Sequence, residues 1–170
     1  MEIKGKIISA VIACYNDGKS IPIMHDRLTK TFKKIGCDYE IIFVNDGSPD
    51  NSEKVLKEIC SNDNNTIAIF HSRNFSSQNA FTSGMIYAKG DAVVLLDGDL
   101  QDPPELIEKF VKKWLIGYDV VYGTRVKRET TRFLNFAYKK FYRLFDRLSY
   151  INVPLDAGDC IFQFGFRLYL

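Results

Sequence analysis

Hydrophobic and polar positions follow two alternating patterns along most of the chain. Short and nearly continuous apolar runs predict strands over residues 7–14, 39–44, 66–71, 92–96 and 120–122. Between them, apolar residues recur every three or four positions, which predicts helices over residues 20–35, 52–60, 78–88 and 104–114. The chain therefore alternates strand, helix and strand.

This alternation predicts an α/β fold. Strand segments such as IISAVIA and AVVLL are apolar at nearly every position, so both of their faces must be covered. We therefore expect a three-layer sandwich in which a mostly parallel central sheet lies between two helical layers. The length of 170 residues and the lack of a linker or repeat indicate one domain.

The composition excludes several classes of protein. With 46% hydrophobic and 26% charged residues, the chain is neither disordered nor of low complexity. The apolar runs are shorter than the roughly 18 residues that span a bilayer, so we expect a soluble, cytoplasmic-side protein without a transmembrane segment in this chain. The four cysteines form no C-x-x-C pair and lie apart from His25 and His71, which indicates reduced thiols rather than a zinc site or disulfides.

The end of the chain is more basic than the rest. Net charge is +2 overall, yet residues 121–170 carry nine lysines and arginines against four acidic residues. Apolar residues at helical spacing within residues 130–148 predict an amphipathic helix with a basic face. That face either is solvated on a helix packed against the sheet or contacts anionic lipid head groups or phosphate. The near-neutral total charge argues against a nucleic-acid partner.

Each predicted strand is followed by polar residues. Ligands of open parallel sheets bind at the carboxyl ends of the strands, so this edge is the expected site. The segments concerned are CYNDG (14–18), NDGSPD (45–50), SRNF (72–75), DGDLQD (97–102) and GTR (123–125).

The segment Asp97-Gly98-Asp99 is the strongest chemical signal. In an extended segment residues i and i+2 face the same side, so both carboxylates converge, and Gln101 joins them if the segment stays extended. Such a pair suits Mg²⁺ or Mn²⁺, which completes its shell with water and phosphate oxygens, and Gly98 would let a ligand approach the backbone. The alternative is an ordinary surface turn.

The chain has no Gly-rich phosphate loop of either common kind, so a metal ion would have to hold any phosphates. Asp46 could accept a hydrogen bond from a base or a ribose, and Tyr15 could stack on a base. Equally, Asp46 could simply open a turn and Tyr15 could close the edge of the sheet.

Taken in order, these segments resemble the family 2 glycosyltransferases. The run DGDLQDPPE (97–105) resembles more narrowly their polyprenyl-phosphate sugar transferase branch, the relatives of dolichol-phosphate mannose synthase. The likeness extends over residues 7–159, and we expect residues 1–159 to form the catalytic domain and residues 160–170 an atypical C-terminal end.

The resemblance implies a Rossmann-like, GT-A type fold and an inverting, metal-dependent transfer. The donor would be a nucleotide-diphosphate sugar (UDP- or GDP-sugar) and the acceptor a polyprenyl phosphate. The enzyme would lie at the cytoplasmic face of the membrane through residues 130–148, and could form a homo-oligomer. The residues implied are Ala13, Tyr15, Asp17, Asp46, Asp97 and Gly98 for the nucleotide sugar, Asp97, Asp99 and Gln101 for Mg²⁺ or Mn²⁺, and Arg125 and Asp159 for catalysis.

Some positions depart from the family pattern. Ser76 stands where the family usually has Gly, Ala13 where it has Pro and Asp17 where it more often has Glu. The segment CIFQF after Asp159 replaces an aromatic residue followed by Arg-Leu. These departures predict a shortened catalytic domain that binds donor but transfers sugar poorly.

Two other functions fit the same residues. One is a family 2 transferase with a saccharide acceptor, which would need a true general base. The other is a non-catalytic nucleotide-sugar-binding module.

Overall fold

The structure is a computed structural model that describes residues 3–124 and 157–164 of the 170-residue chain. The chain divides into two compact units, the first formed by residues 1–122 and 159–170 and the second by residues 123–158. Nearly all described residues belong to the first unit, which holds the described helices and most of the described strands. The predicted helix over 130–148 lies outside the described residues.

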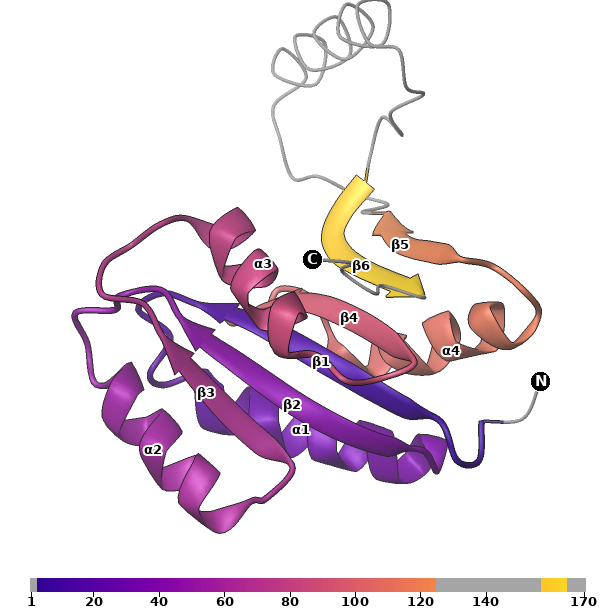
Figure 1. Cartoon of the computed structure of the whole chain (residues 1–170), viewed down its shortest axis with the longest axis horizontal. Helices are drawn as coiled ribbons and strands as arrows, with labels where there is room; N and C mark the ends of the chain where they lie inside the picture. Colours follow the sequence, from indigo (N-terminus) through magenta and orange to yellow (C-terminus); the bar gives the residue numbers. More distant parts are fainter. Residues whose placement is uncertain (1–2, 125–156, 165–170) are drawn as a thin grey trace, which may run out of the picture. The chain divides into compact units, whose positions relative to one another are not determined.

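Helices and strands alternate as the hydrophobic pattern predicts (Figure 1). One helix differs in form, because residues 104–106 make a turn of 3-10 helix before the α-helix begins. The elements are β1 (Ile7–Cys14), α1 (Ile21–Ile35), β2 (Asp38–Asn45), α2 (Ser52–Asn62), β3 (Thr66–Phe70), α3 (Ser77–Tyr87), β4 (Ala92–Asp97), η1 (Pro104–Leu106), α4 (Ile107–Leu115), β5 (Val120–Thr124) and β6 (Ala157–Phe164).

The strands form one mixed sheet in the order β3-β2-β1-β4-β6-β5. β1 pairs in parallel with both β2 and β4, and β2 pairs in parallel with β3, which confirms the predicted parallel core. β6 was not predicted as a strand. It runs antiparallel to β4, with Ala92 opposite Phe164 and Leu95 opposite Ile161. The predicted domain boundary at residue 159 falls within this strand and stays a prediction.

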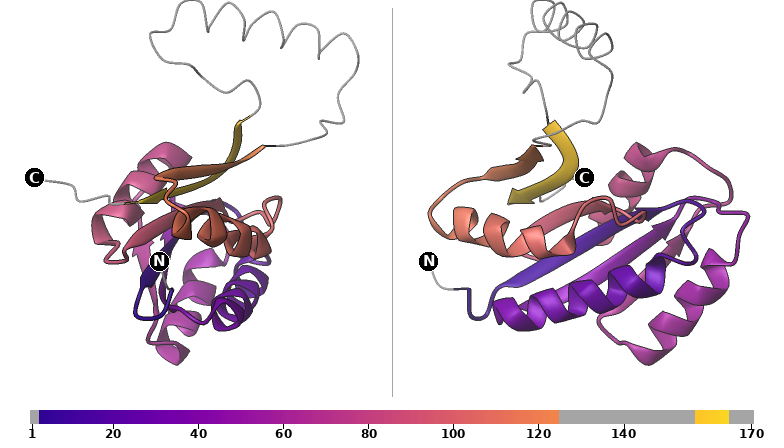
Figure 2. Two further views of the ribbon diagram at one scale, coloured as in Figure 1. Left: turned by 90° about the vertical axis from the view of Figure 1, so that its right-hand side faces the viewer. Right: turned by 180° about the vertical axis from the view of Figure 1, so that it is seen from behind.

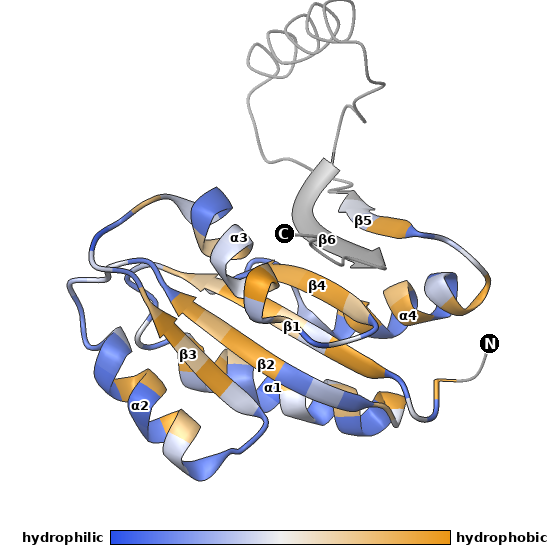
Figure 3. Ribbon diagram, viewed as in Figure 1, coloured by the Kyte–Doolittle hydropathy of each residue, from blue (hydrophilic) through white to orange (hydrophobic). Residues whose placement is uncertain are grey.

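Helices cover both faces of the sheet and bury two apolar clusters (Figures 2 and 3). Even-numbered β1 residues such as Ile8 and Ile12 pack with Phe32 of α1 and Phe110 of α4. Odd-numbered β1 residues such as Val11 pack with α3 on the other face. Because both faces of β1 are buried, polar side chains that contact a ligand must lie in the loops at its ends. In a parallel sheet, ligands bind at the carboxyl ends of the strands, so the functional site is expected there.

Among the residues that the structure describes, no helix combines the length and the apolar character needed to cross a bilayer. Among the described residues, Cys14, Cys37 and Cys60 are free thiols.

Candidate functional site

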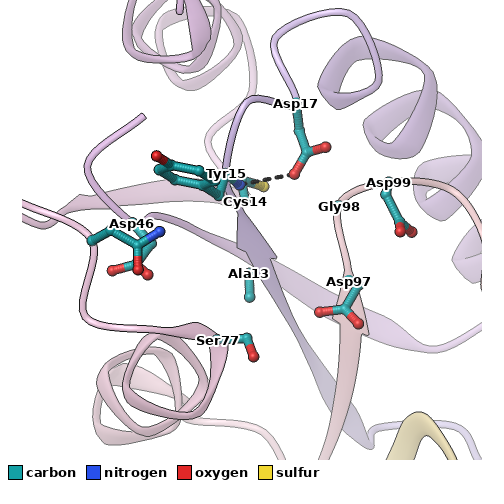
Figure 4. A pocket seen from close by; sticks show the side chains of 10 residues that line it. Ala13, Cys14, Tyr15, Asp17, Asp46, Ser77, Asp97, Gly98 and Asp99 are labelled. Atoms are coloured by element: carbon teal, nitrogen blue, oxygen red, sulfur yellow. Dashed lines mark hydrogen bonds between the residues drawn. The ribbon is translucent and has the colours of Figure 1, made fainter. Parts of the chain in front are cut away.

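A pocket lies where the carboxyl ends of β1, β2 and β4 meet the start of α3 (Figure 4). It brings together most of the predicted nucleotide-sugar and metal residues. In Figure 4, Asp97 and Asp99 lie on one side of the pocket and Asp46 lies on the other, with Ala13 between them. The lining residues are Ala13, Cys14, Tyr15, Asp17, Asp46, Asn74, Ser77, Asp97, Gly98 and Asp99.

The loop after β1 fixes Asp17 at the entrance to α1. Its Oδ2 accepts a hydrogen bond from the Tyr15 N–H at 2.8 Å, and its carbonyl oxygen accepts the N–H groups of Ser20 and Ile21. Asn16 turns the chain between them with a φ of 63°, a conformation that asparagine tolerates better than most residues. The Tyr15 side chain is left exposed beside the pocket, so its ring is available to a ligand.

The loops after β1 and β2 are tied to each other by hydrogen bonds. The Gly18 N–H donates to Asp50 Oδ2 at 2.9 Å, and the Asn16 N–H donates to Ser48 Oγ at 3.2 Å. The Asp46 N–H also donates to the carbonyl of Cys14 at 2.9 Å. These bonds hold the two loops together as one wall of the pocket.

Asp46 is a buried carboxylate with defined partners. Its Oδ1 accepts the Phe75 N–H at 2.9 Å and lies 2.7 Å from His71 Nδ1. The other ring nitrogen of His71 lies 2.9 Å from Ser83 Oγ on α3. Asp46 was predicted from the sequence but His71 was not, because no periodicity shows which residues meet across neighbouring strands.

The acidic side of the pocket is built around Gly98. Its N–H donates to the carbonyl of Ala13 at 2.8 Å, which extends the pairing of β4 with β1. A Cβ at this position would lie 2.8 Å from Asp17 Oδ2 and 2.9 Å from Cys14 Sγ. A larger residue at this position would require the side chains of Asp17 and Cys14 to shift.

Several carboxylates near Asp17 repel one another. Burial raises the pKa of Asp17, the hydrogen bond from the Tyr15 N–H lowers it, and the nearby carboxylates of Asp99 and Asp50 raise it further, so that the net pKa is raised. The pKa of the Cys14 thiol lies well above its usual value, first because it is buried and then because Asp17, Asp97 and Asp50 surround it. A bound cation would relieve this repulsion.

The acidic corner fits a divalent ion that is completed by substrate. Within residues 3–124, no three histidine, cysteine or acidic side chains are grouped as a ready-made metal site. Two carboxylates, Asp97 and Asp99, suffice for Mg²⁺ or Mn²⁺ when phosphate oxygens and water supply the remaining ligands. The donor set therefore suits a hard cation bound together with a phosphorylated ligand.

Gln101 is not brought into this pocket. Leu100 has a φ of 65°, so the segment turns after Asp99 and does not stay extended. The Gln101 N–H instead donates to Asp99 Oδ1 at 2.9 Å, and the residue is exposed. The condition on which Gln101 was aligned with the two aspartates is not met, and its role as a metal ligand stays a prediction.

The two predicted catalytic residues lie outside the part of the chain whose side chains the structure describes. Arg125 lies outside the described residues, and Asp159 is described only as part of the β6 backbone.

The pocket adds three lining residues to which no role was assigned from the sequence, namely Cys14, Asn74 and Ser77. Cys14 and Asn74 lie in polar segments that follow predicted strands, which is the signal that could have identified them.

Comparison with known families gives a match over nearly the whole chain. The family model described as Glycosyl transferase family 2 matches residues 9–169. This range includes every residue of the pocket.

Two curated relatives are about two fifths identical to this chain within the aligned segment. The uncharacterized glycosyltransferase YkcC of Bacillus subtilis (strain 168) is 43% identical over 152 residues, which cover 89% of this chain and 47% of that protein. The undecaprenyl-phosphate 4-deoxy-4-formamido-L-arabinose transferase of Pseudomonas fluorescens (strain SBW25) is 39% identical over 162 residues, which cover 95% of this chain and 45% of that protein. The chain thus spans about half the length of these relatives.

Solved structures show the same fold. Glucosyl-3-phosphoglycerate synthase from Mycobacterium tuberculosis, in complex with Mn²⁺, UDP and phosphoglyceric acid, matches with a TM-score of 0.67 at 20% identity, over 94% of this chain and 56% of that one. The mannosyltransferase PcManGT from Pyrobaculum calidifontis, in complex with GDP-Man and Mn²⁺, matches with a TM-score of 0.62 at 16% identity, over 92% of this chain and 44% of that one. These matches confirm the predicted GT-A type fold.

Proposed function

The chain belongs to glycosyl transferase family 2, and on this premise we propose that it takes a sugar from a nucleotide-diphosphate donor bound in the pocket and transfers it to a polyprenyl phosphate. The observation that carries the proposal is the division of the pocket into two sides. Asp46, which can accept a hydrogen bond from a base or ribose, lies on one side, and the carboxylates of Asp97 and Asp99 lie on the other, with Ala13 between them. A nucleoside would occupy the first side and the diphosphate the second.

The nucleoside side holds groups suited to a base. Asp46 would accept a hydrogen bond from the base or the ribose, and the exposed ring of Tyr15 would stack on the base. Ala13, Asp17 and Gly98 would border the nucleotide, since each of them lines the same pocket.

The acidic side would hold the diphosphate through a divalent ion. Asp97 and Asp99 would bind Mg²⁺ or Mn²⁺, with Gln101 as a predicted further ligand. When bound, the ion would supply positive charge that stabilises the diphosphate as it leaves. The presence of Mn²⁺ in two solved structures of the same fold supports this choice of cation for this chain.

Transfer to a phosphate needs little help from a base. The second pKa of a phosphate monoester is about 6, so the acceptor is largely dianionic near neutral pH and can attack the anomeric carbon with inversion. Arg125 would pair with donor or acceptor phosphate, and Asp159 would orient the acceptor. The naming of three relatives as undecaprenyl-phosphate transferases supports a polyprenyl phosphate as acceptor here.

The position of such an acceptor in a membrane agrees with the basic amphipathic segment at residues 130–148. We assign this segment to a peripheral contact with the cytoplasmic face of the membrane. The homo-oligomer stays a prediction.

Transfer of a radiolabelled sugar to undecaprenyl phosphate in anionic vesicles tests this function. Extraction into organic solvent separates the lipid product from unused UDP-glucose or GDP-mannose, with Mn²⁺ in the buffer. Asp97→Asn should abolish transfer, whereas Asp26→Asn, a change at an exposed carboxylate on α1, should leave it unchanged. Label that appears on a soluble saccharide and not on lipid, or full activity of Asp97→Asn, would contradict the proposal.

A further inference from the structure

His71 joins three elements next to Asp46, which lines the pocket. It follows β3 directly, and its N–H donates to the carbonyl of Asn45 at the end of β2. Its ring lies between Asp46 Oδ1 at 2.7 Å and Ser83 Oγ of α3 at 2.9 Å. The rings of His71 and Phe75 also pack at nearly a right angle, with their centres 5.5 Å apart.

The hydrogen bonds of Asp46 indicate which ring nitrogen of His71 donates to it. An ionised carboxylate can only accept hydrogen bonds, and Oδ1 already accepts the Phe75 N–H. His71 must therefore present Nδ1–H to Oδ1, while Nε2 is left to pair with the Ser83 hydroxyl. The Phe75 N–H and the His71 Nδ1–H therefore both donate to Oδ1 of Asp46. Within the described part of the chain no donor reaches Oδ2, although the residue lines the pocket.

We infer that His71 is a positioning residue that fixes the Asp46 carboxylate so that Oδ2 accepts a hydrogen bond from the donor's base. The inference rests on the proposed function, which places the nucleoside on this side of the pocket. With one oxygen held by two donors, the carboxylate cannot rotate without breaking a bond inside a site where only 4% of its side chain is exposed.

The arrangement selects a class of base. A fixed, acceptor-only oxygen pairs with a ring N–H, which uracil carries at N3 and guanine at N1. Cytosine and adenine present an unprotonated ring nitrogen at the corresponding edge, so they would place two acceptors against each other. His71 thereby favours uridine and guanosine diphosphate donors over cytidine and adenosine ones.

The chain provides a matched control in a second histidine–aspartate pair. His25 Nε2 lies 2.7 Å from Asp63 Oδ2 between α1 and the end of α2, and neither residue lines the pocket. Replacing His25 by Leu removes a pair with the same separation. This variant should lose stability without losing ligand affinity.

Calorimetric titration of UDP, GDP, CDP and ADP in the presence of Mn²⁺ tests the inference. The wild-type chain should bind UDP or GDP at least about tenfold more tightly than CDP and ADP, the difference expected for one hydrogen bond to a charged group. His71→Leu should bind the preferred nucleotide about tenfold more weakly and should lose much of that preference. His71→Asn, whose amide N–H₂ can replace Nδ1–H, should stay within about threefold of wild type. His25→Leu should keep the wild-type affinity.

Several outcomes would overturn the inference. The inference is wrong if folded His71→Leu keeps the wild-type affinity and base preference. It is also wrong if His71→Asn and His71→Leu lose affinity equally, because the lost hydrogen bond would then not be the cause. A wild-type preference for CDP or ADP would also contradict it. If His71→Leu does not fold, His71→Asn and Ser83→Ala carry the test, and Ser83→Ala should weaken binding by about threefold because the ring loses one of its two anchors. A folded wild-type chain that binds none of the four nucleotides would instead contradict the proposed function.

Discussion

Ser76 is held in a backbone conformation that suits glycine. Its φ is 78° and its ψ is 157°, a region that residues with a Cβ rarely enter. Hydrogen bonds fix it there, because its N–H donates to Asn74 Oδ1 at 2.9 Å and its carbonyl accepts the N–H groups of Asn79 and Ala80. The strain lies at the edge of the pocket, directly before Ser77. It also explains why a glycine at this position would be the usual family residue.

Replacing Ser76 by Gly should therefore stabilise the protein. Strain of this kind costs about 1–3 kcal/mol, and glycine gives back about 0.4–1 kcal/mol through the greater freedom of its unfolded chain. The expected net gain in the free energy of unfolding is about 0.5–2 kcal/mol. At about 2–4 °C for each kcal/mol in a chain of this size, Tm should rise by a few degrees. Urea titration followed by circular dichroism measures the first quantity and a thermal scan the second.

Two further variants separate backbone strain from side-chain effects. Ser76→Ala should leave stability nearly unchanged, because the serine hydroxyl makes no capping hydrogen bond and alanine is strained equally. Ser61→Gly makes the same chemical change inside α2, also removes the hydrogen bond from the Ser61 hydroxyl to the exposed Glu58 carbonyl, and should destabilise by about 0.5–1 kcal/mol. A Ser76→Gly variant that is no more stable than wild type would refute this reasoning.

Three other properties of the described residues can be tested. Burial raises the pKa of Asp63, but hydrogen bonds from Thr66, His25 and Asn65 lower it more, so that the net pKa is lowered. The stability that these hydrogen bonds provide should therefore be present above about pH 4 and be lost as the pH falls through the lowered pKa. Urea unfolding at pH 7 and pH 3 measures this loss, which should be smaller in Thr66→Val; an equal loss in both proteins would contradict it. Iodoacetamide at pH 8 should leave Cys14 unmodified in the native protein, because its raised pKa keeps the thiol protonated, and rapid labelling found by peptide mass spectrometry would count against this. Gly47→Ala should destabilise by about 2–4 kcal/mol, because φ is 65° and a Cβ would lie 2.6 Å from the Arg73 Cα. An unchanged urea midpoint would show that this close approach does not exist in solution.

The parallel core was predictable from the sequence for a simple reason. Strands buried on both faces need apolar residues at nearly every position, and β1, β2 and β4 carry that pattern. β6 carries no comparable signal. It becomes a strand because the free edge of β4 offers it a pairing partner, which no local pattern shows.

The sequence predicts the position of the site in the fold but not all of its contacts. Parallel strands bring their carboxyl ends to one edge, so the order of strands and polar segments along the chain was enough to place Asp46, Asp97 and Asp99 in a common pocket. The segment turns at Leu100, where the Gln101 N–H donates to Asp99 Oδ1. The pairing of His71 with Asp46 depends on a contact between residues 25 positions apart. Neither follows from spacing along the chain.

Metal-dependent binding of a nucleotide sugar is the central claim, and calorimetric titration with UDP-glucose and GDP-mannose tests it most directly. Each donor is titrated with Mn²⁺ and again with a chelator, against wild type and Asp99→Ala. We predict that wild type binds one of the two donors only when Mn²⁺ is present, and that Asp99→Ala abolishes this binding. Unchanged Mn²⁺-dependent affinity in Asp99→Ala, or no binding of either donor by the folded wild-type chain, would contradict the account.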